Sequence, residues 1–211
     1  MLEVIGALKN LMPTQKAKEN NLKSSSNLYS PQWVSTDQLP KDLYSEILPN
    51  LFMGGTHDDD VVYAKPTDKH KINSNKFDCV ITMYAWANPT DWGVEEIRYG
   101  IPDSDINDAN IRKLLDIAYW GYQRWLSGEK VLIRCQAGLN RSGLITTLIL
   151  MMNELHPTSA INLIRDKRTP FALFNKNYVS WLTENARQEV KHFLEAKGQS
   201  MLKPTSEFIG N

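Results

Sequence analysis

The segment from Val131 to Gly143 places the tightest constraint on how this chain can fold. A short apolar run, Val131-Leu132-Ile133, leads to Cys135, and five residues separate that cysteine from Arg141. A second apolar run with helical character extends from Leu144 to Met152. Short runs of β-branched residues favour buried strands, and longer apolar runs favour helices. The segment therefore predicts a strand, a tight polar loop and a buried helix.

The predicted loop suits a bound anion. Backbone N–H groups point inward where a loop enters a helix N-terminus, and the helix dipole adds partial positive charge there. Gly138 allows backbone torsions that other residues resist. Arg141 would offer two parallel N–H donors to a phosphate-sized anion.

The same positive field favours the thiolate of Cys135, a nucleophile, and the Ser142 hydroxyl could donate a hydrogen bond to it. Taken alone, a cysteine at the end of a buried strand is more often a small hydrophobic residue. The spacing to Arg141 favours the catalytic interpretation. The predicted anion-binding residues are Gln136, Ala137, Gly138, Leu139, Asn140 and Arg141.

At these positions the chain resembles the cysteine-based dual-specificity and tyrosine protein phosphatases, with most likeness to bacterial and phage-type members. That superfamily carries Cys-x5-Arg-Ser/Thr in its loop, which Cys135, Arg141 and Ser142 match. The resemblance implies an α/β single domain with a central, mostly parallel sheet of four to five strands flanked by helices, and neither cofactor nor metal. The superfamily usually has a histidine before the cysteine, which helps hold the loop and tune the thiol. This chain has Arg134 there, and the sequence leaves its role open.

The resemblance also implies a general acid upstream of the loop. Asp103 lies 32 positions before Cys135 and Asp105 lies 30 positions before it. If this loop corresponds to the Ile-Pro-Asp-Gly motif of some members, Asp103 is the acid. If it corresponds to the Ile-Pro-x-x-Asp motif of others, the acid is Asp105. We favour Asp103 over Asp105. Either aspartate could instead cap the following helix, but Asp108 suits that role.

Composition restricts the remaining function classes. The 211 residues allow one sizeable core, and 24 basic residues balance 24 acidic ones, so a non-specific nucleic-acid binder is disfavoured. Two cysteines cannot form a disulfide framework. Neither a signal peptide nor a run of about 20 apolar residues is evident, so we expect a cytoplasmic protein without a membrane span. We expect an N-terminal arm over residues 1–32, the phosphatase domain over 33–197 and a tail over 198–211.

Hydrophobic patterning predicts the other elements of the domain. We expect a hairpin over Tyr44–Gly55, strands over Phe77–Met83 and Glu95–Pro102, and helices over Ala109–Leu126, Ala160–Lys167 and Lys176–Ala196, with Thr158 and Ser159 capping the second of these helices.

Several residues have both a structural and a functional interpretation. Asp58–Asp60 suits a helix start better than a metal site. Cys79 suits the core, although a disulfide with Cys135 under oxidation is an alternative. Tyr84–Gly93 is an aromatic loop that either lines the substrate site or covers the core. Arg168 suits a solvated helix end better than a substrate contact, and Asn175 is a candidate support for the catalytic loop. The four histidines lack ligand spacing: His57, His70, His156 and His192.

These observations predict a hydrolase for phosphoproteins, acting on phosphotyrosine and also considered for phosphoserine and phosphothreonine, through a cysteinyl-phosphate. An RNA 5′-phosphatase is an alternative, because related RNA triphosphatases carry Gly-x-Asn-Arg-Thr-Gly where this chain has Gly138-Leu139-Asn140-Arg141-Ser142-Gly143. A pseudophosphatase that only binds phosphorylated partners is another. A phosphoinositide phosphatase is disfavoured because positions 136–140 contain no lysine, and a sulfurtransferase is disfavoured by the Arg-Ser-Gly ending.

Overall fold

The computed structural model describes residues 40, 42–56, 77–90 and 93–199. The predictions for the N-terminal arm, Asp58–Asp60, His57, His70 and residues 200–211 of the tail lie outside the described residues. Within the described part of the chain, no helix is long and apolar enough to cross a membrane.

The sheet has five strands in the order β1-β2-β5-β3-β4. β1 pairs antiparallel with β2, and the other three pairings are parallel. This arrangement confirms the predicted α/β class and the mostly parallel sheet. The strands are β1 (Tyr44–Leu48), β2 (Leu51–Gly54), β3 (Cys79–Thr82), β4 (Glu95–Arg98) and β5 (Val131–Arg134).

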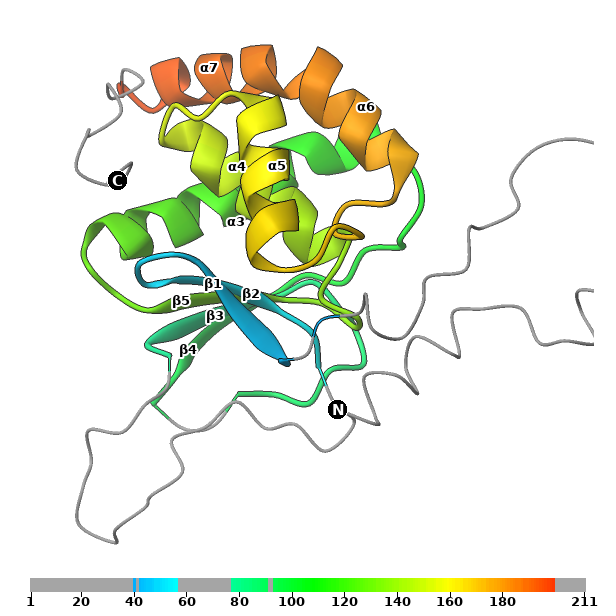
Figure 1. Cartoon of the computed structure of the whole chain (residues 1–211). Coiled ribbons are helices and arrows are strands. Elements are labelled where there is room, and N and C mark those ends of the chain that lie inside the picture. Colours follow the sequence, from blue (N-terminus) through cyan, green and yellow to red (C-terminus); the bar gives the residue numbers. More distant parts are fainter. Residues whose placement is uncertain (1–39, 41, 57–76, 91–92, 200–211) are drawn as a thin grey trace, which may run out of the picture.

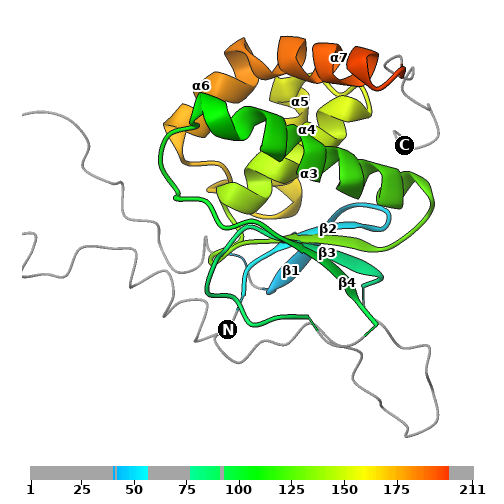
Figure 2. The ribbon, with the colours of Figure 1, turned by 180° about the vertical axis from the view of Figure 1, so that it is seen from behind.

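The described helices all lie on one face of this sheet, as Figures 1 and 2 show from opposite sides. α4 packs against β2 and β5 and also contacts α3, α5 and α7. Each of its residues is buried, because it has neighbours on every side. The helices are α3 (Asp108–Leu126), α4 (Arg141–Met152), α5 (Pro157–Lys167), α6 (Lys176–Glu184) and α7 (Ala186–Ala196).

Alternating side chains of the central strand β5 serve two separate cores. Val131 and Ile133 join the large core beneath the helices, together with Cys135 just beyond the strand. Leu132 joins a smaller cluster with Phe77, Val80 and Val94. Because successive side chains of a strand point to opposite faces, Arg134 projects to the second face, away from the helices and from Cys135.

The ends of two helices and one strand differ from the sequence prediction. The side chain of Asn107, not Asp108, caps α3 by accepting a hydrogen bond from the Ala109 N–H at 2.9 Å. α5 begins at Pro157 rather than Ala160, and the cap is His156, not Thr158 or Ser159. Proline favours the first helical position because its missing N–H would have no partner there. The strand predicted to reach Pro102 ends at Arg98.

The predicted helix over Lys176–Ala196 is two helices. Asn185 stands between α6 and α7 and adopts φ −118°, which departs from helical geometry. The Asn185 side chain makes no capping hydrogen bond; its backbone N–H donates to Trp181 O as the last bond of α6, and its carbonyl accepts from Gln188 N–H at the start of α7.

A polar cluster lies on the second face of the sheet at the ends of β3, β4 and β5. We call Thr82, Glu96, Arg98 and Arg134 the Glu96 cluster. Its central carboxylate, only 9% exposed, accepts hydrogen bonds from the Thr82 hydroxyl, from Arg98 Nη1 at 3.1 Å and from Arg134 Nη2 at 3.2 Å. Arg134, whose side chain is fully buried, also donates from Nε to Thr82 Oγ1 at 2.8 Å.

The protonation of Glu96 reflects these contacts. Burial alone would raise its pKa, but hydrogen bonds from Thr82 and the Thr90 N–H and the charges of Arg134 and Arg98 lower the pKa below its ordinary value of 4.5. A folded-state pKa below the unfolded value adds stability above pH 4.5, and that stability is lost as the pH falls through the folded-state pKa.

Glu96→Gln should therefore lower the free energy of unfolding at pH 7, and the difference from wild type should shrink as the pH falls from about 4.5 toward 3. Urea unfolding measured across this range tests the expectation. Glu95→Gln is the matched control, because its 53% exposed side chain pairs with Arg124 at the surface, where an ion pair contributes only about 0–1 kcal/mol. A constant or widening gap between wild type and Glu96→Gln on acidification would contradict the assignment.

Candidate active site

Cys135 lies at the carboxyl end of the central strand, where a parallel α/β sheet presents its ligands. Its side chain is buried, and its Sγ lies 3.3 Å from the Ser142 Oγ. α4 begins at Arg141 and not at Leu144, so the loop predicted to carry the chemistry runs directly into the helix N-terminus. Cys135, Ser142 and Arg141 thus meet in one strand–loop–helix unit.

The carbonyl groups of the loop are bonded to the surrounding structure. Gln136 O accepts a hydrogen bond from Thr56 N–H at 3.0 Å, and Leu139 O accepts one from Leu173 N–H at 3.2 Å. Asn140 O accepts the first bond of α4, from Leu144 N–H.

The N–H groups of the same loop behave differently. From Gln136 to Arg141 they donate to no acceptor in the described part of the chain. Buried backbone donors normally have partners. A ring of N–H donors around a thiol is therefore suited to a bound anion.

Gly138 packs directly against the end of β2. Its φ is +66°, and a Cβ atom at this position would lie 2.3 Å from the Gly54 carbonyl carbon and 2.4 Å from Gly55 N. Both the backbone conformation and the lack of space require glycine here. The predicted backbone torsion at Gly138 is confirmed by its positive φ, and the contact with Gly54 is a second reason for glycine that the sequence did not indicate.

Arg168 supports the loop from behind. It is 6% exposed, and it donates from Nε to Gly138 O at 3.1 Å and from Nη1 to Asp42 O at 2.8 Å and Ser45 Oγ at 3.1 Å. Burial lowers the pKa of this arginine to about 10, so it stays charged at neutral pH. The prediction of a solvated helix end was wrong, because Arg168 caps α5 at the point where that helix meets the loop.

Arg141 extends from the first turn of α4 toward the segment before α3. Its Nη1 donates to Ile101 O at 3.2 Å, and its guanidinium carbon lies 5.3 Å from the centre of the Tyr84 ring. Its Nε is buried and has no hydrogen-bond partner among the described residues. A fixed, buried guanidinium with a spare donor is suited to binding an oxyanion.

The carboxylate of Asp103 is held beside the loop by two asparagines. Asn140 donates from Nδ2 to one carboxylate oxygen at 3.0 Å, and Asn175 donates from Nδ2 to the other at 2.9 Å. Asn140 Oδ1 in turn accepts from Asn175 N–H at 3.0 Å. Asn175 thus contacts both Asp103 and the loop residue Asn140.

The second candidate acid is directed elsewhere. The Asp105 carboxylate accepts a hydrogen bond from Asn177 at the start of α6. Tyr178, which the sequence did not single out, donates from its hydroxyl to Pro102 O at 2.8 Å and so holds the Ile101–Asp103 segment from the same helix. Burial raises the pKa of Tyr178, so its hydroxyl remains a donor at neutral pH.

Arg134 does not reach Cys135. Its guanidinium lies in the Glu96 cluster on the other face of the sheet, which answers the question that the sequence left open. The alternative disulfide between Cys79 and Cys135 is wrong. Cys79 pairs with Val131, four residues before Cys135, which is about 13 Å along the strand and beyond the ~7 Å limit for the Cα atoms of a disulfide. Burial raises the pKa of the Cys79 thiol to about 12, as expected for a core residue.

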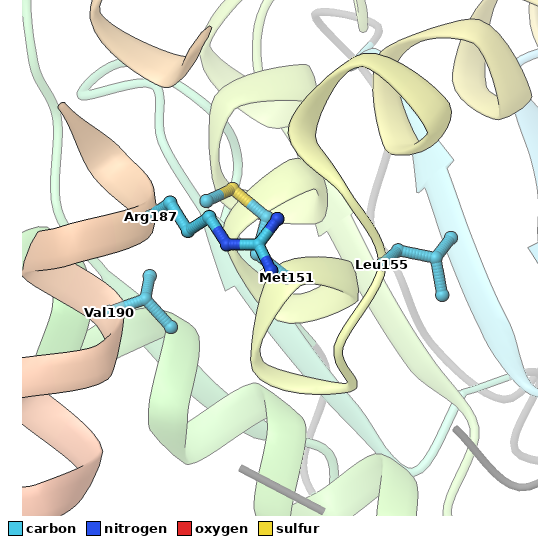
Figure 3. Close-up of a pocket in the computed structure, with 4 residues that line it drawn as sticks. All are labelled: Met151, Leu155, Arg187 and Val190. Carbon is cyan, nitrogen blue, oxygen red and sulfur yellow. The ribbon is translucent and has the colours of Figure 1, made fainter. Parts of the chain in front are cut away.

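A shallow hollow lined by Met151, Leu155, Arg187 and Val190 lies between the carboxyl-terminal end of α4 and α7 (Figure 3). It has no enclosed space large enough for a water molecule, so it does not form a ligand-sized cavity. Met151 is ten residues along α4 from Arg141, or about 15 Å. The hollow is therefore separate from the loop.

Gly138→Ala should disrupt the loop, because an added methyl group cannot fit against Gly54. We expect destabilisation of at least about 2 kcal/mol, from overpacking and from the left-handed backbone. Chemical unfolding measures this loss. Gly128→Ala is a control with φ +90° and nothing within 4 Å of the added Cβ, so it should cost only about 1 kcal/mol. Equal losses in the two variants would show that the contact with Gly54 is unimportant.

Comparisons with known proteins agree with this geometry. A sequence profile of the dual-specificity phosphatase catalytic domain matches residues 62–188. Dual specificity protein phosphatase 22 of Mus musculus is 25% identical over 169 residues, which cover 77% of this chain and 86% of that protein.

Solved structures share the fold. Human DUSP28 is similar with a TM-score of 0.56 and 19% identity, covering 75% of this chain and 99% of its own. Tk-PTP in its active form is similar with a TM-score of 0.54 and 23% identity, covering 70% of this chain and 98% of its own. Because the profile matches more than half of the sequence, the chain belongs to the dual-specificity phosphatase family and contains that family's catalytic domain.

Proposed function

We propose that this protein hydrolyses phosphomonoesters of phosphoproteins through a cysteinyl-phosphate intermediate, acting on phosphotyrosine and also on phosphoserine or phosphothreonine. The observation that carries the proposal is the loop from Gln136 to Arg141. Its N–H groups have no partner among the described residues, and Cys135 lies at its base. Such a loop binds a tetrahedral dianion and places its central atom next to the sulfur.

In the first step the Cys135 thiolate attacks phosphorus, an S–P bond forms and the bond from phosphorus to the ester oxygen breaks. Asp103 donates a proton to the departing oxygen, which leaves as an alcohol or phenol. In the second step Asp103 removes a proton from water, whose oxygen attacks phosphorus and displaces the sulfur as a thiolate. Ser142, 3.3 Å from Cys135 Sγ, donates a hydrogen bond to that thiolate.

The loop N–H groups and Arg141 bind the remaining phosphoryl oxygens in both steps, where negative charge is greatest. Arg141 has a buried Nε without a hydrogen-bond partner among the described residues, and a phosphoryl oxygen bound beside it would supply that partner. Asn140 and Asn175 hold the Asp103 carboxylate and thereby orient it.

The alternatives receive less support. The Asn140 side chain, which carries the resemblance to RNA triphosphatases, is already bonded to Asp103 and to Asn175 N–H and so has an internal role. The equal numbers of basic and acidic residues also do not favour an RNA substrate. The pseudophosphatase alternative was motivated by Arg134, which stands where the superfamily usually has histidine. The Arg134 side chain lies on the opposite face of the sheet from Cys135.

Cys135→Ser should abolish turnover, because a serine hydroxyl is a poor nucleophile without a neighbouring base. We expect hydrolysis of p-nitrophenyl phosphate and of a phosphopeptide panel to fall about 10³-fold or more. Cys79→Ser, in the core, is the control for loss of a thiol. Near-normal turnover by Cys135→Ser would disprove the mechanism. Preferred release of phosphate from 5′-triphosphate RNA by the wild type would instead support the RNA alternative.

Asp103→Asn should remove the general acid. With a phosphopeptide, whose leaving group needs protonation, we expect kcat to fall about 10²–10⁴-fold, with loss of the limb of the pH–rate profile that reports the protonated acid. Asp105→Asn is the matched control and should retain both the rate and that limb. Loss of the limb only in Asp105→Asn would identify Asp105 as the acid.

A further inference from the structure

An aromatic surface adjoins the arginine of the loop. Tyr84 and Trp86, which we call the aromatic rim, follow β3, and their ring centres lie 5.7 Å apart at an interplanar angle of 64°. The Tyr84 ring lies 5.3 Å from the Arg141 guanidinium carbon. Trp86 is 82% exposed, more than any other large hydrophobic side chain in the described part of the chain. The rim thus extends from the anion-binding loop into solvent.

The segment that carries the rim has no regular secondary structure, but its backbone is held from the second face of the sheet. Arg134 Nη2 donates to Asn88 O, and Arg98 Nη2 donates to Ala87 O. Two residues after Asn88, the Thr90 N–H donates to Glu96 Oε2 at 3.2 Å. The Glu96 cluster therefore bonds to the backbone at positions 87, 88 and 90, directly after Trp86.

Stability alone does not account for this cluster. Moving an arginine and a carboxylate out of water costs free energy, and their mutual attraction often does no more than offset that cost. Apolar residues of similar volume often stabilise a fold as well or better. The cluster does provide geometry, since planar guanidinium groups fix the positions of the carbonyls that they contact. A loop fixed before binding loses less conformational entropy when a ligand binds.

We propose that the Glu96 cluster positions the aromatic rim as a binding surface for the residues that flank the phosphorylated side chain of a phosphopeptide. Trp86 contacts the peptide, and Arg134, Arg98 and Glu96 are positioning residues that act through the segment from Ala87 to Thr90. The inference deepens the proposed function and rests on it. It also assigns a role to the arginine that precedes the cysteine: Arg134 positions the substrate-binding surface and does not tune the thiol.

The test compares a small substrate with a peptide. Trp86→Ala should raise KM for a phosphopeptide about tenfold, the size expected for one aromatic contact, and should leave kcat and KM for p-nitrophenyl phosphate within about twofold. Glu96→Gln should have the same pattern. The double variant should be no worse than either single variant, because both changes remove the same contact. Glu95→Gln, on the same strand, should behave as wild type.

The possible results separate the explanations. Multiplying effects in the double variant, or equal losses for both substrates, would overturn the positioning role. An unchanged phosphopeptide KM in Trp86→Ala would overturn the rim. If Glu96→Gln does not fold, Arg98→Gln replaces it, because the Arg98 side chain is 35% exposed and still holds Ala87 O.

Failure of the proposed function gives a different result. If the wild type turns over no phosphopeptide, its binding can still be measured in the Cys135→Ser background by calorimetry. Trp86→Ala should then weaken phosphopeptide binding about tenfold, and binding of inorganic phosphate should not change. Equal phosphopeptide affinities with and without Trp86 would overturn the inference independently of catalysis.

Discussion

The site depends on how the backbone of the loop after β5 is held. The loop carbonyls of Gln136, Gly138 and Leu139 are each bonded to a different neighbour: the chain after β2, Arg168 and the chain after α5. A peptide unit whose carbonyl is fixed outward must point its N–H the other way, so these bonds create the ring of inward donors. The contact between Gly138 and Gly54 brings the loop close enough for this arrangement, and no larger residue would allow it.

Because side chains alternate along β5, the neighbouring residues Arg134 and Cys135 lie on opposite faces of the sheet. Cys135 lies on the face covered by α4, where the helix N-terminus and the loop surround it. Arg134 lies on the opposite face, where Glu96 balances its charge and Thr82 accepts from its Nε. Arg134, although next to Cys135 in sequence, therefore lies on the other face of the sheet. A buried arginine that does bond to a loop carbonyl is Arg168, 33 positions after Cys135.

Much of the fold could be predicted from local sequence patterns, and the predictions that were wrong have identifiable physical causes. Local apolar patterns mark the hairpin, the buried strands β3 and β5 and the buried face of α3. These patterns are visible in the sequence because the residues that an element buries in the core are apolar. The caps at Asn107 and His156 each depend on a single side-chain hydrogen bond, and the break at Asn185 depends on the backbone conformation of one residue; neither leaves a periodic signal in the sequence. The prediction for Arg168 was wrong because a basic residue at a helix end is usually solvated, whereas here it is buried and bonds to Gly138, Asp42 and Ser45.

The sequence by itself determined that Cys135, Arg141 and the helix after them belong to one strand–loop–helix unit, because their spacing is local and needs no distant partner. It also narrowed the proposed general acid to two aspartates, since both follow Ile101-Pro102. Only the tertiary structure decided which of them is held beside the loop. Asn140 and Asn175, 35 residues apart in the chain, converge on Asp103, while Asp105 bonds to Asn177. Contacts between segments so distant in sequence arise when the helices pack on the sheet, and no local spacing encodes them.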